Sequence, residues 1–126
     1  MIKVCAERAL KEELHERASF IQTDLTDYEP EERFNVAIGI GLFDYVRDPL
    51  PVLAKMRQSV DGRAILSFPR RWTWRAPVRK ARLALKGCDV YFYTASEIER
   101  LLKAAGFARY EIKKVGQLHC VTAYAR

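Results

Sequence analysis

The sequence predicts an α/β fold built around a parallel sheet, and three observations lead to this prediction. The uncharged apolar run at residues 34–40 is typical of a strand that is covered on both faces. Segments with helical periodicity alternate with short apolar runs over the first half of the chain. The last two apolar runs are separated only by Gly116-Gln117, a spacing typical of a tight antiparallel hairpin. We therefore expect a parallel sheet that ends in a hairpin.

The bulk properties indicate a single soluble domain. The chain has 126 residues, 49% of them hydrophobic, and no apolar run approaches the length of a membrane span. Acidic residues near the start of the chain argue against a signal peptide. The three cysteines, Cys5, Cys88 and Cys120, have no C-x-x-C spacing. We expect reduced thiols in a cytoplasmic protein, with no metal site.

The first three elements lead to a candidate ligand crevice. Apolar residues recur at helical spacing over residues 2–17, which predicts an amphipathic helix. Residues 19–23 are expected to form a short strand, and residues 34–40 the next one. That second strand passes into Gly39-Ile40-Gly41 and then toward a helix. Open α/β sheets bind ligands at the carboxyl ends of such strands, so we expect a crevice there.

The next helix has clear start and stop signals. Asp48 is a suitable N-cap, Pro49 a suitable first residue, and Asp61-Gly62 marks the expected end. Residues 63–68 are mostly apolar and are expected to form the third strand. We expect the helix to bury four apolar side chains, Leu50, Leu53, Met56 and Val60.

The remaining elements follow a basic segment. Residues 70–86 are rich in arginine and lysine, and a helix is expected from about residue 76. Residues 89–93 form a short aromatic extended segment, and Thr94-x-x-Glu97 is a capping box for a helix that stops at Gly106. That helix is expected to bury Ile98, Leu101, Leu102 and Ala105. Two strands, at residues 108–115 and 118–125, complete the chain.

The chain has a net charge of +6, and the basic segment concentrates arginine and lysine with no acidic residue between them. It has several interpretations. It can be a solvated basic face with its tryptophans in the core. It can also be a lid over an anionic substrate, a nucleic-acid patch or an interfacial helix on anionic lipid. Among these functional interpretations we favour the substrate lid, with Arg71 and Trp72 as substrate-binding candidates, because arginine suits carboxylate and phosphate recognition.

Three segments together resemble the class I S-adenosylmethionine-dependent methyltransferases. F-I-Q-T-D-L is similar to the third strand of that family, and F-N-V-A-I-G-I-G-L-F-D-Y-V-R-D-P to its fourth strand and following loop. L-L-K-A-A-G-F followed by a hairpin is similar to its usual ending. S-F-P and Tyr91-Phe92-Tyr93 resemble the branch that contains magnesium-protoporphyrin methyltransferases. The resemblance covers nearly the whole chain and implies a Rossmann-like methyltransferase sheet.

The resemblance also implies roles for particular residues. Asp24 and Leu25 would hold the adenine of S-adenosylmethionine; the alternative for Asp24 is a carboxylate that closes an Asx-type turn. Gly39 and Ile40 would lie against the methionyl part of the cofactor, or else form only a tight exit from the strand. Asp44 and Tyr45 would face the methyl donor or acceptor, or else be ordinary loop residues. His15 and His119 are isolated, and we assign them no catalytic role.

The departures from the family pattern concern the cofactor site. The Gly-rich turn after the family's first strand and the acidic residue that ends its second strand have no counterpart, and Asn35 stands where the family commonly has Asp. Gly39-Ile40-Gly41 lacks the third glycine, with Asp44 in its place. The resemblance thus implies a partial, N-terminally truncated domain. In the family's strand order, residues 19–23 would then have no neighbour on the side of residues 34–40.

That gap allows three outcomes: the strand shifts to pair with residues 34–40, a partner chain or second copy covers the edge, or the half-sheet is unstable alone. We expect the intact protein to transfer a methyl group to a small or lipid-like acceptor, and the isolated chain to be inactive. The alternative is a non-enzymatic interaction module that presents its basic helix to nucleic acid or membrane.

Overall fold

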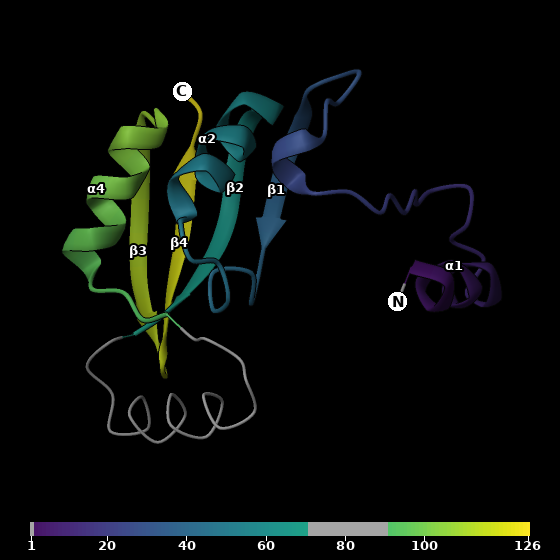
Figure 1. The fold of residues 1–126 in the computed structure, drawn as a ribbon, viewed down its shortest axis with the longest axis horizontal. Helices are drawn as coiled ribbons and strands as arrows, with labels where there is room; N and C mark the ends of the chain where they lie inside the picture. The colour runs from purple at the N-terminus through teal and green to yellow at the C-terminus, as the bar shows by residue number, and fades with distance from the viewer. Residues whose placement is uncertain (1, 71–90) are drawn as a thin grey trace.

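The computed structural model describes residues 2–70 and 91–126 and contains a four-stranded sheet (Figure 1). β1 and β2 are parallel, and β2–β4 and β4–β3 are antiparallel. This confirms the predicted α/β fold with a closing hairpin, in which Gly116 adopts a φ of 58°. The spatial order of the strands is β1 (Phe34–Gly39), β2 (Val60–Pro69), β4 (Leu118–Tyr124) and β3 (Arg109–Val115).

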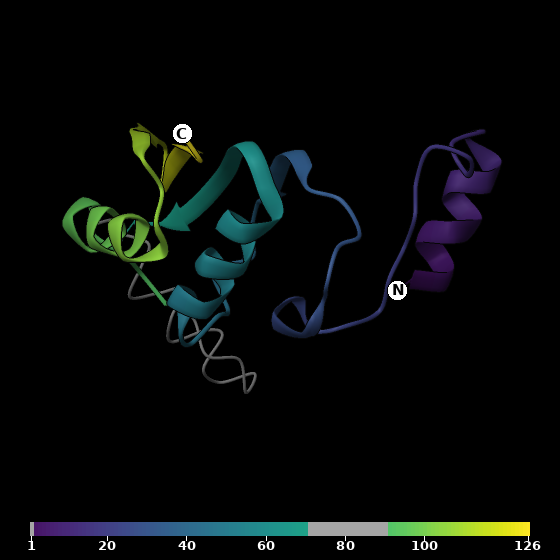
Figure 2. The ribbon, with the colours of Figure 1, turned by 90° about the horizontal axis from the view of Figure 1, so that it is seen from above.

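Helices α2 (Pro49–Ser59) and α4 (Ala95–Ala105) cover one face of this sheet (Figure 2). The strand register places Ala64, Leu66 and Phe68 of β2 on the same face as Val121 and Ala123 of β4. All of these side chains are buried and pack with the helices in a single core. The helices contribute four fully or nearly buried side chains to it, Leu53, Met56, Ile98 and Leu102.

The opposite face of β1 is open, which differs from the expectation of a strand covered on both faces. Val36 is 40% exposed and Ile38 69%, although both lie in the apolar run that led to that expectation. The register pairs them with Arg63 and Ile65, on the face away from α2. Among the described residues no helix packs on this face, so only one of the two faces of β1 is covered.

Helix α1 (Ile2–Lys11) is shorter than the predicted helix over residues 2–17, and it stands apart from the sheet (Figures 1 and 2). It ends in a Schellman-type motif: the Leu14 amide donates to the Ala9 carbonyl at 2.7 Å and the Glu13 amide to the Leu10 carbonyl at 3.2 Å. Glu13 takes the left-handed φ of 59° that this motif requires. Backbone closure therefore stops the helix before its apolar periodicity ends.

Residues 19–23 do not form the predicted strand. They run as an extended segment and do not shift to pair with β1. A strand needs a hydrogen-bonded neighbour, and no such neighbour lies beside this segment in the part of the chain that the structure describes. The 3-10 helix η1 (Leu25–Asp27) follows directly and packs against α2.

The boundary between α2 and β2 lies earlier than expected. The helix ends at Ser59 rather than near Asp61-Gly62, and Val60 is buried as the first residue of the strand. Asp48 occupies the N-cap position but makes no capping hydrogen bond with its side chain. Leu50, expected in the core, is 36% exposed.

The segment that leads into α4 follows the sequence prediction closely. The Thr94 side chain accepts a hydrogen bond from the Glu97 amide at 3.3 Å, which confirms the N-terminal half of the capping box. Gly106 ends the helix with a φ of 96°. Ile98 and Leu102 are buried as expected, whereas Leu101 and Ala105 are half-buried. Arg70 pairs with Tyr93 in an isolated parallel bridge.

Several predictions fall on residues 71–90, outside the described residues. They are the basic helix, the substrate candidates Arg71 and Trp72, and the thiol of Cys88. Cys5 and Cys120 are free thiols, as expected. No helix in residues 2–70 or 91–126 combines the length and apolar character needed to cross a bilayer.

Candidate functional site

The candidate site is built around the exit of β1. Because β1 and β2 are parallel, their carboxyl ends meet at one edge of the sheet (Figure 1). The last pair of the ladder is Gly39 with Leu66, and beyond it the chain leaves the sheet. This exit loop runs to Asp48, where α2 begins. Four of the predicted site residues lie on it or just before it: Gly39, Ile40, Asp44 and Tyr45.

Position 39 is closely packed. A Cβ atom there would lie 3.2 Å from Leu66 Cδ2 and 3.5 Å from Met56 Cε, on the face covered by α2. The missing side chain therefore allows the covered face to pack. Ile40, by contrast, has its side chain 61% exposed. Packing at the strand exit is therefore enough to account for a small residue at position 39. The backbone of residue 40 follows the last pair of the ladder and lies at the edge of the sheet.

The turn continues through Gly41, which has a φ of 75° and open space where a Cβ would lie. Its amide donates a hydrogen bond of 3.0 Å to the hydroxyl oxygen of Ser67 on β2. Glycine adopts a positive φ more readily than residues that carry a side chain. The exit of β1 is thus fixed to the neighbouring strand and opens on its outer side to unfilled space.

Asp44 and Tyr45 differ sharply in exposure. Asp44 is 6% exposed and Tyr45 56%. The backbone carbonyl of Asp44 accepts a hydrogen bond of 3.0 Å from the Tyr91 amide, which ties the loop to the segment before α4. Of the two, only Tyr45 presents most of its side chain to solvent. Asp44 is therefore not an ordinary surface loop residue, because its side chain is buried although it belongs to the loop.

Tyr93, in the same segment before α4, anchors the loop at a second point. Its hydroxyl donates a 3.4 Å hydrogen bond to the Val46 carbonyl, and its ring meets the Phe68 ring edge-on at 5.1 Å. Burial raises the pKa of Tyr93 to about 12, with further contributions from the negative charges of Glu97 and Asp44. This phenol therefore stays protonated and keeps its donor role at neutral pH.

Asp24 lies in a different setting. One oxygen of its carboxylate accepts hydrogen bonds from the Thr26 hydroxyl at 2.7 Å and the Thr26 amide at 2.9 Å. The hydroxyl bond, followed by the amide bond, lowers the pKa of Asp24. The carboxylate thus caps η1, which is the Asx-type role that the sequence left open as the alternative.

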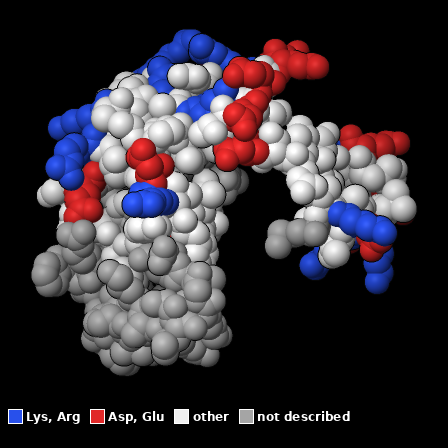
Figure 3. All heavy atoms as spheres, viewed as in Figure 1, with Lys and Arg blue, Asp and Glu red and all other residues white. Residues whose placement is uncertain are grey.

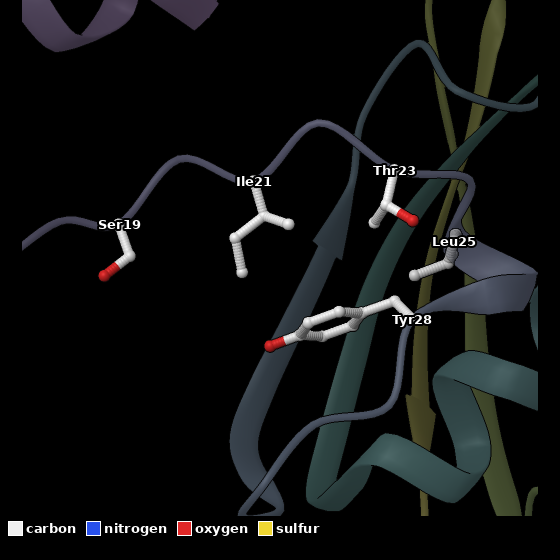
Figure 4. Close-up of a pocket in the computed structure, with 5 residues that line it drawn as sticks. All are labelled: Ser19, Ile21, Thr23, Leu25 and Tyr28. Atoms are coloured by element: carbon white, nitrogen blue, oxygen red, sulfur yellow. The ribbon is translucent and has the colours of Figure 1, made fainter.

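Leu25 lines a pocket of about 270 Å³ beside the extended segment (Figure 4). Ser19, Ile21 and Thr23 project from that segment, with the Tyr28 ring across from them. The sequence did not single out these four side chains. The period-two spacing of Ser19, Ile21 and Thr23 was the available signal, because alternate residues of an extended chain share one side.

An adjoining groove of about 470 Å³ is acidic. It includes Glu29, Glu31 and Glu32, and acidic side chains gather where the segment before β1 meets the body (Figure 3). Glu29 forms an ion pair of 2.6 Å with Lys55 of α2. This contact holds η1 beside the second half of α2. The turn at residues 25–27 accordingly packs against α2, whereas Gly39–Gly41 lies at the exit of β1 (Figure 1).

No model of a known protein family matches the chain, and no curated protein matches it. Solved structures do match. A protein of Nostoc punctiforme named as a candidate O-methyltransferase superposes on 98% of the chain with a TM-score of 0.79 at 16% identity. An O-methyltransferase family protein of Burkholderia thailandensis superposes on 97% with a TM-score of 0.72 at 14% identity.

A third match is the magnesium protoporphyrin IX methyltransferase of Synechocystis with bound S-adenosylmethionine. It covers 98% of the chain with a TM-score of 0.68 at 16% identity. The chain covers 41%, 40% and 54% of these three structures in turn. At these identities the likeness establishes the fold, which is that of the S-adenosylmethionine-dependent methyltransferases. The chain thus spans about half or less of each of these three structures.

Proposed function

We propose that this chain takes part in methyl transfer from S-adenosylmethionine to a small or lipid-like acceptor. The observation that carries the proposal is the strand order β1-β2-β4-β3, with one parallel pair followed by a hairpin, in a fold whose solved examples include a methyltransferase with S-adenosylmethionine bound. Fold likeness alone does not fix an activity, so the proposal also rests on the exit of β1.

In this proposal the exit of β1 receives the methionyl part of the cofactor. Support comes from Gly41, where a side chain would meet no atom within 4 Å, and from its neighbours Gly39 and Ile40 at the end of the strand. In this proposal these backbone groups bind the cofactor by close approach, which glycine permits. Leu25 and the pocket beside it would receive the adenine, with Asp24 placed to accept from its exocyclic amine through the oxygen that Thr26 does not use.

The acceptor would lie on the outer side of the same exit. Tyr45 is the exposed candidate contact, Asp44 lies buried behind it, and Arg71 and Trp72 are proposed to contribute from outside the described residues. Bound S-adenosylmethionine supplies an electrophilic methyl group. Transfer then depends chiefly on alignment of the acceptor, so the contribution of these residues is positioning, and a general base is needed only for a weakly nucleophilic acceptor.

The described residues supply only one side of such a site. Since the chain spans about half or less of the three solved structures compared above, we propose that a complete site needs further structure, from a partner chain, a second copy or additional sequence. The isolated chain is therefore expected to bind S-adenosylhomocysteine weakly, and the binding should still be local to the two segments named above.

Nuclear magnetic resonance titration of the isolated chain tests this proposal. S-adenosylhomocysteine at millimolar concentration should shift the backbone amide signals of Leu25, Gly39 and Ile40. Adenosine, which lacks the methionyl part, should shift Leu25 and leave Gly39 and Ile40 unchanged. Shifts confined to other parts of the chain, or none at all, would remove the support for a methyltransferase site. Micromolar affinity by calorimetry would support the function and contradict the incomplete site.

A further inference from the structure

Ser67 is a buried hydroxyl with a specific partner. It lies in β2 between the core residues Leu66 and Phe68, and its exposure is 1%. Its oxygen accepts the hydrogen bond of 3.0 Å from the Gly41 amide. A buried hydroxyl is costly unless it is hydrogen-bonded, so this contact accounts for a polar residue at an otherwise apolar position.

The strand register explains why Gly41 needs this partner. The β1–β2 ladder ends at the pair Gly39–Leu66, one residue before Ser67. Beyond that pair the chain turns away through the left-handed φ of Gly41. A backbone amide that leaves a ladder must find another acceptor or stay unsatisfied. The Ser67 side chain supplies the acceptor at the first position past the ladder.

We propose that Ser67 is a positioning residue for the candidate cofactor turn Gly39–Gly41. This inference rests on the proposed function, since it assigns to Ser67 the task of holding the backbone that would meet the methionyl part of S-adenosylmethionine. Ser67 does not touch that ligand in this account. It acts through the Gly41 amide and fixes where the chain leaves the sheet.

The remainder of the exit loop has its own anchors, so the effect of Ser67 is confined to the turn. Phe43 stacks on Phe68, and the Asp44 carbonyl accepts from the Tyr91 amide. Tyr93 holds the Val46 carbonyl. Loss of the Ser67 hydroxyl would therefore release Gly41 while leaving residues 43–46 in place, and η1 with Asp24 and Leu25 would be unaffected.

Three variants of the full chain test the inference. Ser67→Ala removes the acceptor, and Ser67→Thr keeps it. Thr122→Ala removes a half-buried hydroxyl from β4 on the same sheet face, and that hydroxyl has no hydrogen bond within the described residues. In Ser67→Ala, amide hydrogen exchange at Gly41 should accelerate roughly tenfold, since its hydrogen bond is lost. Ser67→Thr and Thr122→Ala should exchange like the unaltered chain.

The ligand readout separates positioning from a general structural role. On titration with S-adenosylhomocysteine, Ser67→Ala should lose most of the shift at Gly39 and Ile40 and keep the shift at Leu25, and Ser67→Thr should restore all three. Unchanged Gly41 exchange in Ser67→Ala, or an equal loss of shift at Leu25, would overturn the inference. If the unaltered chain shows no shifts with S-adenosylhomocysteine, the proposed function fails, and so does the role of Ser67 in positioning a cofactor turn. The hydrogen bond between Ser67 and Gly41 is still tested separately, by amide hydrogen exchange at Gly41.

Discussion

The ring of Phe43 stacks on the ring of Phe68, with centroids 4.5 Å apart and an interplanar angle of 19°. Both side chains are fully buried. Phe43 belongs to the exit loop of β1, and Phe68 lies near the end of β2. This contact therefore joins the loop that carries the candidate site to the hydrophobic core, and it makes the site loop part of the folded body.

Phe43→Ala should consequently destabilise the whole chain. Removal of a fully buried phenylalanine costs about 3–5 kcal/mol of unfolding free energy, through lost transfer energy and the cavity that remains. Tyr45→Ala is the matched control, because Tyr45 lies two residues away on the same loop and is 56% exposed. Its cost should stay within about 0.5 kcal/mol. Urea unfolding followed by circular dichroism measures both. Equal costs for the two variants would show that the loop is not packed as described.

Gly62 provides a second test of how β1 is held. β1 has an irregular register between Phe34 and Val36, and a Cβ on Gly62 of β2 would overlap the carbonyl oxygen of Asn35 at this irregularity. Gly62→Ala should therefore destabilise the chain by about 1–3 kcal/mol through overpacking against backbone.

Gly116→Asn is the control for Gly62→Ala. Gly116 has a φ of 58° in the hairpin turn, with open space around it, and asparagine tolerates that conformation. Its unfolding midpoint should change little, as measured by thermal or urea denaturation. A mild effect of Gly62→Ala, no larger than that of the turn variant, would contradict the close approach of β1 and β2.

His119 should make stability depend on pH. It is 4% exposed, and its Nδ1 has no hydrogen-bond partner among the described residues. Burial, followed by the positive charge of Arg70, lowers the pKa of His119, with Lys114 acting in the same direction; a hydrogen bond with the Tyr93 backbone opposes them. In the unfolded chain this histidine has an ordinary pKa of about 6.5. As the pH falls toward that value, the unfolded chain therefore binds more protons than the folded chain. Stability contributed by His119 is thus present above that pH and is lost as the pH falls.

Urea midpoints at about pH 7.5 and about pH 5.5 measure this effect. The unaltered chain should lose more stability between the two than His119→Gln, which cannot acquire the charge. His15→Gln is the control, since His15 is exposed and should leave the pH dependence as it is. The same pH dependence in the chain with and without His119 would show that other groups, such as carboxylates, account for it.

The sequence predicted those elements whose signals are local. The capping box at Thr94, the stop at Gly106 and the hairpin at Gly116 each depend on a few neighbouring residues, and all three are found. Residues 19–23 were predicted as a strand from composition, but strand formation depends on a neighbour elsewhere in the chain. Likewise, the apolar run of β1 shows that both faces of the strand are suited to burial. It does not show whether an element elsewhere in the chain covers each face.

The candidate site shows the same division. The exit of β1 was located from its glycines and the following helix, and the loop lies where the sequence placed it. Gly39 was interpreted either as a point of close approach to the cofactor or as a tight exit from the strand, and its close packing against Leu66 supports the second interpretation. The hydrogen bonds of Ser67 and Tyr93 to the exit loop were missed because their partners, Gly41 and Val46, are distant in sequence. Only the fold brings such pairs together.

The outer edge of β1 should promote self-association of the chain. In residues 2–70 and 91–126 this edge has no paired strand, and the strand carries neither proline nor lysine to protect it. Ile38, 69% exposed, lies on its open face. Ile38→Lys should therefore suppress concentration-dependent association, as followed by light scattering and sedimentation velocity, at a stability cost within about 0.5 kcal/mol. Val4→Lys, at a 64% exposed position on α1, adds the same charge away from the edge and should leave association unchanged. Equal suppression by both variants would assign the effect to net charge instead of the strand edge.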